Sequence, residues 1–291
     1  MENCFQLRKS SVSFWCQHST STLISVILFT LQFCSPINGQ AHLSDQDVSE
    51  TIAAFKTSDV SKRVMQFQKT LRDPNRREKL RPKVRRIILN EFGKIRIEDA
   101  SAVRKIRKII APIMEFYDRK GFYEIFLLDH KSPYIMEHSG VALIITTGLI
   151  LEAKTEDEIL GFVAHEIGHE YFSIYTRLSE QLFVAVHKNG REKALSRHFA
   201  KILAILELQC DAFAALTLYH LGYNQRAFTE AAERFSGEFP ADPEAYHPKS
   251  KVRRRFVEKL VPSKTSADRK QTGKLLKEVQ SYLKYKLNDD F

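Results

Sequence analysis

The sequence predicts an α+β fold that is mostly helical, with a small sheet flanked by helices. Basic helical patterns extend from about residue 44 to residue 121. Two short apolar runs, 123–129 and 141–150, then indicate β-strands. Two long patterns with helical spacing follow, at about 155–186 and 194–221. Because long helical segments surround only two strand signals, we expect helices to cover a small sheet.

The two strands are predicted by their β-branched and aromatic residues. In the stretch "YEIFLLD", polar and apolar residues first alternate and an apolar run then follows. The stretch "VALIITTGLI" is rich in β-branched residues, and we expect its strand to end at Gly148. The polar stretch 130–140 between them predicts a loop. We expect the strand 141–147 to be the sheet edge that pairs with an extended peptide.

Capping signals predict where the long helices begin and end. Thr155 and Glu158 match a capping box, which places the start of the first long helix there. Gly222 predicts the end of the second long helix. A short basic helix near 250–260 and an amphipathic helix near 268–287 are expected to complete the chain.

Composition suits one sizeable domain with helical extensions. The chain has 291 residues, 43% of them hydrophobic, and a formal net charge of +10 that favours anionic partners. Changes in composition divide it into a leader (1–40), a basic helical region (41–110), a central domain (111–262) and a C-terminal amphipathic helix (263–291).

The leader carries the apolar run "LISVILFTLQF", residues 23–33. A helix of this length spans about 16 Å, which suits a signal-peptide core better than a membrane span. Pro36 and Gly39 break the run, so we expect cleavage near Gly39 and export to a bacterial periplasm or cell envelope. A membrane anchor that is not cleaved and an organelle transit peptide, with residence in an intermembrane space, are the alternatives. After cleavage Cys210 would be the single cysteine, so no internal disulfide could form.

The basic helical region has its densest charge in "NRREKLRPKVRRIILNEF". Seven Lys and Arg residues lie between Arg76 and Arg86. Such a run can contact an anionic membrane or a nucleic acid, but a solvated helix face is its commoner explanation. We therefore expect no nucleic-acid partner and only peripheral contact with an anionic membrane.

The stretch "GFVAHEIGHEYF" carries two histidines four residues apart. On a helix, His165 and His169 lie on one face and can each offer a ring nitrogen to one metal ion. Glu166 lies about 100° around the helix from His165, where its carboxylate can reach a water bound to that ion. This spacing predicts a zinc pair with an adjacent general base, whereas the alternative is a chance pair in a buried helix.

A catalytic zinc site needs a third protein ligand, and "ELQCD" supplies one. Glu207 and Asp211 lie one turn apart in the apolar stretch "AILELQCDAFAAL", where a lone carboxylate would be costly to bury. Both are explained if Glu207 binds the cation and Asp211 accepts a hydrogen bond from a ligating histidine. Capping or ordinary ion-pair contacts are the alternative explanation for these two carboxylates.

These residues resemble the gluzincin metallopeptidases of family M48, which show H-E-x-x-H and then E-x-x-x-D on the next helix. "HEIGH" and "ELQCD" match those motifs, and "YHP" followed by Arg253 resembles a later part of the family pattern. The resemblance covers roughly 100–260. The family usually has Ala where Cys210 precedes Asp211, and Ser132-Pro133-Tyr134 stands where the family has Asn-Ala before its edge strand.

The resemblance implies a zinc-dependent metalloendopeptidase with one zinc ion per chain. Zinc lowers the pKa of its water toward ~7, and Glu166 takes the proton and passes it to the leaving amine. His247 or Arg253 is implied to stabilise the transition state or to belong to a loop that gates the site. We expect unfolded or misfolded proteins and peptides as substrates, in envelope or membrane-associated quality control.

The chain resembles a short form of the family, since it shows neither a multi-span membrane region nor tetratricopeptide repeats. Three other functions are the alternatives to proteolysis in the envelope. They are a chaperone or adaptor on a metallopeptidase scaffold, a DNA-associated HExxH protease, and a stress protease of an organelle inner membrane.

Overall fold

The computed structural model describes residues 43–70, 80–138, 140–173, 192–235, 248–262 and 273–289. The predicted leader, His247 and residues 174–186 of the first long predicted helix lie outside them. In chain order the elements are α3 (Asp45–Phe55), α4 (Val60–Thr70), α5 (Arg81–Phe92), the 3-10 helix η1 (Gly93–Ile95), β1 (Arg96–Ile97), α6 (Ala100–Phe116), β2 (Glu124–Leu128), β3 (Ile135–His138), β4 (Ala142–Thr146), α7 (Thr147–Glu152), α8 (Glu156–Ser173), α10 (Glu192–Leu221), α11 (Ala227–Phe235), α12 (Ser250–Leu260) and α13 (Lys274–Asp289).

The predicted class is confirmed, because helices surround one four-stranded mixed sheet of order β1-β2-β4-β3. Strands β2 and β4 pair in parallel, while β1 and β3 pair antiparallel with their neighbours. The sheet is covered on both faces: Leu127 and Leu143 face the main helical core, whereas Phe126 and Ile144 pack with Val84 of α5. Burial on both faces explains why β2 and β4 are continuous apolar runs.

Two predictions about the strands were wrong in detail. Strand β4 ends at Thr146, two residues before the predicted end at Gly148, because the Thr146 hydroxyl accepts the N–H of Leu149 and caps α7. The predicted loop 130–140 contains β3. Its turn back to β4 is closed by the N–H of Val141 donating to the carbonyl of His138, with Gly140 at φ 70°.

The predicted edge strand was also wrong, since β4 lies inside the sheet and β3 forms the edge. The sequence could not show this, because β3 has only four residues, two apolar and two polar, and its pairing depends on a tight turn. An extended peptide can therefore add to β3 but not to β4.

The two long helices are confirmed over the described residues. At the start of α8, the Thr155 hydroxyl accepts the N–H of Glu158 at 3.4 Å. The other half of the predicted capping box differs, because the Glu158 carboxylate binds the N–H of Lys154 and the guanidinium of Arg234. Gly222, at φ 85°, follows the end of α10 as predicted. The short helix α11 was not predicted.

Among the described residues, one segment is long and apolar enough to cross a membrane by length and composition, Lys201–Leu221 of α10. Core helices of soluble proteins satisfy the same criterion. Here 72% of the apolar window is buried within the protein, and the segment contains Glu207 and Asp211. The packing thus assigns this apolar surface to the protein core.

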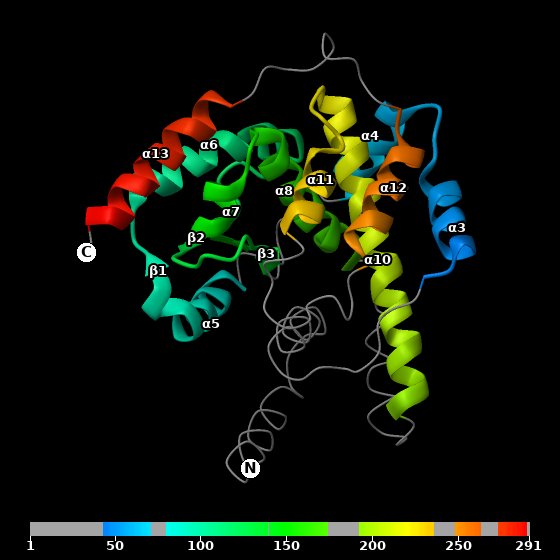
Figure 1. Ribbon diagram of the computed structural model, residues 1–291, viewed down its shortest axis with the longest axis horizontal. Coiled ribbons are helices and arrows are strands. Elements are labelled where there is room, and N and C mark those ends of the chain that lie inside the picture. The colour runs from blue at the N-terminus through cyan, green and yellow to red at the C-terminus, as the bar shows by residue number, and fades with distance from the viewer. Residues whose placement is uncertain are drawn as a thin grey trace.

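The N-terminal helices pack into the same core as the central helices. Figure 1 shows α3 and α4, in blue, beside α10 and α12 on one side of the molecule. Phe67 of α4 stacks on Phe213 of α10 with ring centroids 4.7 Å apart, and Lys201 pairs with Asp47 at 2.8 Å. Region 43–70 therefore packs against α10 as part of the same core.

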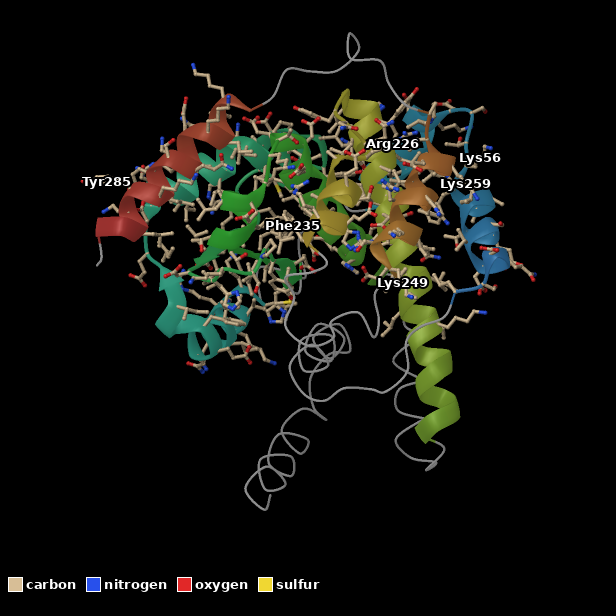
Figure 2. The ribbon with its side chains drawn as sticks, in the orientation of Figure 1. Lys56, Arg226, Phe235, Lys249, Lys259 and Tyr285 are labelled. Atoms are coloured by element: carbon tan, nitrogen blue, oxygen red, sulfur yellow. The ribbon has the colours of Figure 1, made fainter. Side chains whose placement is uncertain are left out.

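The C-terminal helix α13 closes the opposite side, where Figure 1 shows it lying along α6. Leu276, Val279 and Leu283 are buried in the main core. The Gln280 amide donates to the carbonyl of Ala153 and to two carbonyls of α7. Tyr285 lies on the outer side of α13, at the outer edge of the molecule in Figure 2.

His138 at the end of β3 makes folding sensitive to acid. Burial lowers the pKa of His138 to about 4, from an ordinary value of 6.5. Because the unfolded chain binds the proton more readily, this contribution to stability is present above pH 6.5 and is lost as the pH falls through about 4. In the wild type, His138 is expected to lower the free energy of unfolding by roughly 2–3 kcal/mol as the pH falls from 6.5 to 4. The variant His138→Leu should not show this decrease.

Urea unfolding at several pH values measures this difference. His130→Leu, at an exposed position, is the control for the replacement of a histidine by leucine. Parallel profiles for His138→Leu and the wild type would contradict the assignment.

Candidate metal centre

The centre is built where α8 and α10 cross, the most extensive contact between any two described elements. Gly168 makes the approach close: a Cβ at this position would lie 3.1 Å from Cα and 3.2 Å from Cβ of Cys210. Any larger residue at 168 would push the helices apart. The crossing therefore brings the histidine-bearing face of α8 against the carboxylate-bearing face of α10.

His165, His169 and Glu207 form a compact group whose ligand atoms all lie within 4.8 Å of one another. The two histidine Nε2 atoms are 3.1 Å apart, and each lies 3.3 Å from an oxygen of Glu207. A tetrahedron with bonds of about 2.0–2.1 Å has edges of roughly 3.3 Å, so the spacing of the two ring nitrogens suits a zinc-sized ion, while the two 3.3 Å contacts involve different oxygens of Glu207. The donor set of two imidazoles and one carboxylate fits the same metal.

Among the three candidate ligand residues, His169 is the most exposed. The side chains of His165 and Glu207 are 5% and 7% exposed, whereas that of His169 is 17% exposed. Glu166 is half-buried beside them. Solvent therefore reaches the group on the side of His169 and Glu166.

Glu166 is oriented by the edge strand. Its Oε2 accepts the backbone N–H of Glu137 in β3 at 2.9 Å. The Thr146 N–H donates to the Tyr134 carbonyl across the β3–β4 ladder. In an antiparallel ladder every second residue faces the partner strand, so the residues two and four positions after Tyr134 direct their backbone groups toward β4. The N–H of Glu137 consequently points away from β4, and it reaches the carboxylate on α8.

Asp211 lies behind His165 and is held by Arg253 from α12. His165 Nδ1 is 2.9 Å from Asp211 Oδ1. The Arg253 Nε donates to Oδ2 at 2.8 Å and its Nη2 donates to Oδ1 at 2.6 Å, a bidentate pair. Asp211 is fully buried, so the guanidinium supplies the countercharge that this carboxylate needs.

Neighbouring charges lower the pKa of Asp211 and raise the pKa of His165. Burial alone would raise the pKa of Asp211, but the Arg253 guanidinium outweighs it and lowers that pKa. Burial likewise lowers the pKa of His165, but hydrogen bonds to Asp211 and Glu207 outweigh burial and raise it to about 9. A metal that binds the Nε2 of His165 must therefore displace a proton.

Cys210 is the neighbour of the second histidine, with Sγ 3.5 Å from His169 Nδ1. It is fully buried, and burial raises the pKa of its thiol well above the ordinary value. The motif indicated only that Cys210 stands where the family usually has Ala, and it did not indicate the contact with His169. Its position three residues after Glu207, on the face that also carries Asp211, could have indicated it.

The structure brings together most of the residues that the motifs predicted. His165, His169, Glu207, Glu166 and Asp211 meet at the crossing of α8 and α10. Arg253 joins them through Asp211, and its implied role in transition-state stabilisation or gating stays a prediction. His247 lies outside the described residues. The hydrogen bond from the Glu137 N–H to Glu166 could not be predicted, because a backbone group does not depend on the type of side chain.

The described residues thus hold a candidate site for one metal ion, with the carboxylate of Glu166 beside it. The chain matches the model of Peptidase family M48 over residues 99–261, more than half of its length, and it belongs to that family. It is therefore a metallopeptidase. No curated protein matches the chain.

Replacing Arg253 with Gln tests the buried ion pair. The change leaves the Asp211 carboxylate buried without its guanidinium partner, which we expect to destabilise the metal-free fold by about 3–5 kcal/mol. His165 also loses its fixed acceptor, so zinc affinity should fall by about 10-fold to 100-fold. Urea unfolding and zinc titration against a competing chelator measure the two effects.

Arg254→Gln is the matched control, because the neighbouring Arg254 is 40% exposed and pairs with Glu233 on the surface. That variant should keep both properties close to those of the wild type. Equal unfolding midpoints for the two variants would show that the Arg253–Asp211 pair has no special role.

Proposed function

We propose that the chain is a zinc-dependent endopeptidase that hydrolyses peptide bonds in unfolded or misfolded proteins. The observation that carries the proposal is the triangle of His165, His169 and Glu207 ligand atoms, with Glu166 next to it. The 3.1 Å spacing of the two ring nitrogens, close to the edge of a tetrahedral zinc site, and the donor set of two imidazoles and a carboxylate support the choice of metal.

Bound zinc would supply Lewis acidity, which activates a water molecule and polarises a carbonyl group. The protein residues supply the rest of the chemistry. Glu166 takes a proton from the attacking water and passes it to the leaving amine. The N–H of Glu137 fixes one carboxylate oxygen of Glu166, so the base is oriented before the substrate arrives. Asp211 and Arg253 hold His165 in one orientation.

The edge strand β3 favours an extended substrate. The backbone N–H and carbonyl of Ile135 point away from β4, because Ile135 and Glu137 occupy the same kind of position in the ladder. A peptide added along β3 would lie beside Glu166, whose carboxylate binds this strand. Extended segments are most available in unfolded chains, which supports misfolded proteins as the substrate class.

We also propose export to an envelope compartment, supported by the apolar run 23–33 in the leader. Exposed cations on α5 and α6, among them Arg85, Arg86, Arg104 and Lys108, favour peripheral contact with an anionic membrane. Cell fractionation with an antibody to the mature chain should find a shortened protein in the periplasmic or envelope fraction. A full-length protein in the cytosolic fraction would contradict export.

The decisive test of the reaction is Glu166→Gln. The amide oxygen can still accept the N–H of Glu137, but it cannot take a proton from water. We therefore expect normal zinc content and a loss of casein cleavage of at least about 10²-fold. Zinc per chain by elemental analysis and the cleavage rate are measured on the same preparation.

Two controls separate the base from the metal. Glu207→Ala should lose both zinc and cleavage, and a chelator should stop cleavage by the wild type. Glu115→Gln, an exposed change on α6, should alter neither property. Cleavage by Glu166→Gln at the wild-type rate would refute the role of Glu166, and zinc-loaded wild type that cleaves no protein would refute the endopeptidase.

A further inference from the structure

Cys210 lies behind the ligand histidine His169 in the way that Asp211 lies behind His165. Its Sγ is 3.5 Å from His169 Nδ1, while the Nε2 of that ring faces His165 and Glu207. We propose that Cys210 is a positioning residue of the metal centre, which accepts a hydrogen bond from His169 Nδ1–H and holds Nε2 toward the metal. This inference rests on the proposed zinc site.

The direction of the bond follows from the tautomer. A histidine that binds a metal through Nε2 carries its ring proton on Nδ1, and that N–H needs an acceptor. The sulfur of a cysteine is a weak acceptor, and the distance of 3.5 Å suits a bond to sulfur. Glu207, Cys210 and Asp211 occupy one face of α10, so a single helix face supplies one ligand and both acceptors.

Packing alone accounts for a small residue at 210 but not for the sulfur. The closest contacts to a Cβ at Gly168 would come from Cα and Cβ of Cys210, at 3.1 and 3.2 Å. Alanine has the same two atoms, so it would keep the close approach to Gly168, although it would lose the packing of the buried sulfur. What cysteine adds is the Sγ atom, and this atom contacts the ring nitrogen of a ligand.

The two histidines are consequently held with unequal strength. His165 is bound to a carboxylate that Arg253 fixes, and its side chain is 5% exposed. His169 faces a neutral thiol on the more open side of the group, with 17% exposure. A weak acceptor leaves the His169 ring easier to tilt than His165, so removing it should loosen the ligand on the substrate side.

The experiment compares Cys210→Ala and Cys210→Ser in the full mature chain. Zinc dissociation constants are measured against a competing chelator, and cobalt is substituted for zinc to record the visible absorption bands. Alanine removes the acceptor, so we expect about tenfold weaker zinc binding and altered cobalt bands. Serine provides an oxygen acceptor, so it should restore zinc affinity to within about threefold of the wild type.

Ile145→Val is the packing control, because it deletes one buried carbon from the same core in β4, away from the metal group. Cys210→Ala and Ile145→Val should lower the melting temperature of the metal-free protein similarly, but only Cys210→Ala should weaken zinc binding. The melting curve also shows whether each variant is folded.

Two results would overturn the inference. Zinc affinity of Cys210→Ala equal to that of the wild type would show that the sulfur does not position His169. Equal losses for Ala and Ser would show that packing, and not an acceptor, is what Cys210 provides. Neither result would affect the proposed peptidase, whereas wild-type protein that binds no stoichiometric zinc would refute both.

Discussion

The close crossing of α8 and α10 is the constraint on which the rest of the site depends. Gly168 allows the backbone of Cys210 to approach within contact distance, and this approach sets the separation between the histidine face and the carboxylate face. A wider crossing would leave His165 and Glu207 too far apart to share one ion. The spacing of the ligand atoms is thus a property of helix packing.

Much of the remaining architecture stabilises that crossing from outside. The helices α3 and α4 pack on α10, and Phe67 inserts an aromatic ring against Phe213. The helix α12 brings Arg253 to the buried carboxylate of Asp211. On the other side, Leu276 N–H of α13 donates to Glu156 at the start of α8. Elements outside the central helices therefore hold both site helices in place.

Charge inside the centre is arranged so that each buried group has an opposite partner. Arg253 neutralises Asp211, Asp211 orients His165, and Glu207 faces both histidines. Burial lowers the pKa of His165, but the carboxylates of Asp211 and Glu207 outweigh burial and favour a positive charge at this ring. The centre is consequently prepared for a positive ion, because the buried carboxylates outnumber the fixed cation.

The sequence by itself determined the long helices and indicated the candidate ligand residues that the structure brings together. Helical periodicity and the H-E-x-x-H spacing depend on residues within a few turns, so local geometry places His165, Glu166 and His169 correctly. Glu207 and Asp211 were found because carboxylates are costly in an apolar helix. The family pattern also indicated Arg253, but not that it binds Asp211.

Only the tertiary structure decided which strand forms the edge and what surrounds each ligand. The strand β3 has a weak local signal, and its pairing depends on the turn at Gly140 and on β4. The N–H of Glu137 reaches Glu166 because the ladder turns it outward, a matter of register that no side chain reveals. Cys210 contacts His169 only because two helices far apart in the chain meet at Gly168. These features are contacts between distant segments, which periodicity and motif spacing do not encode.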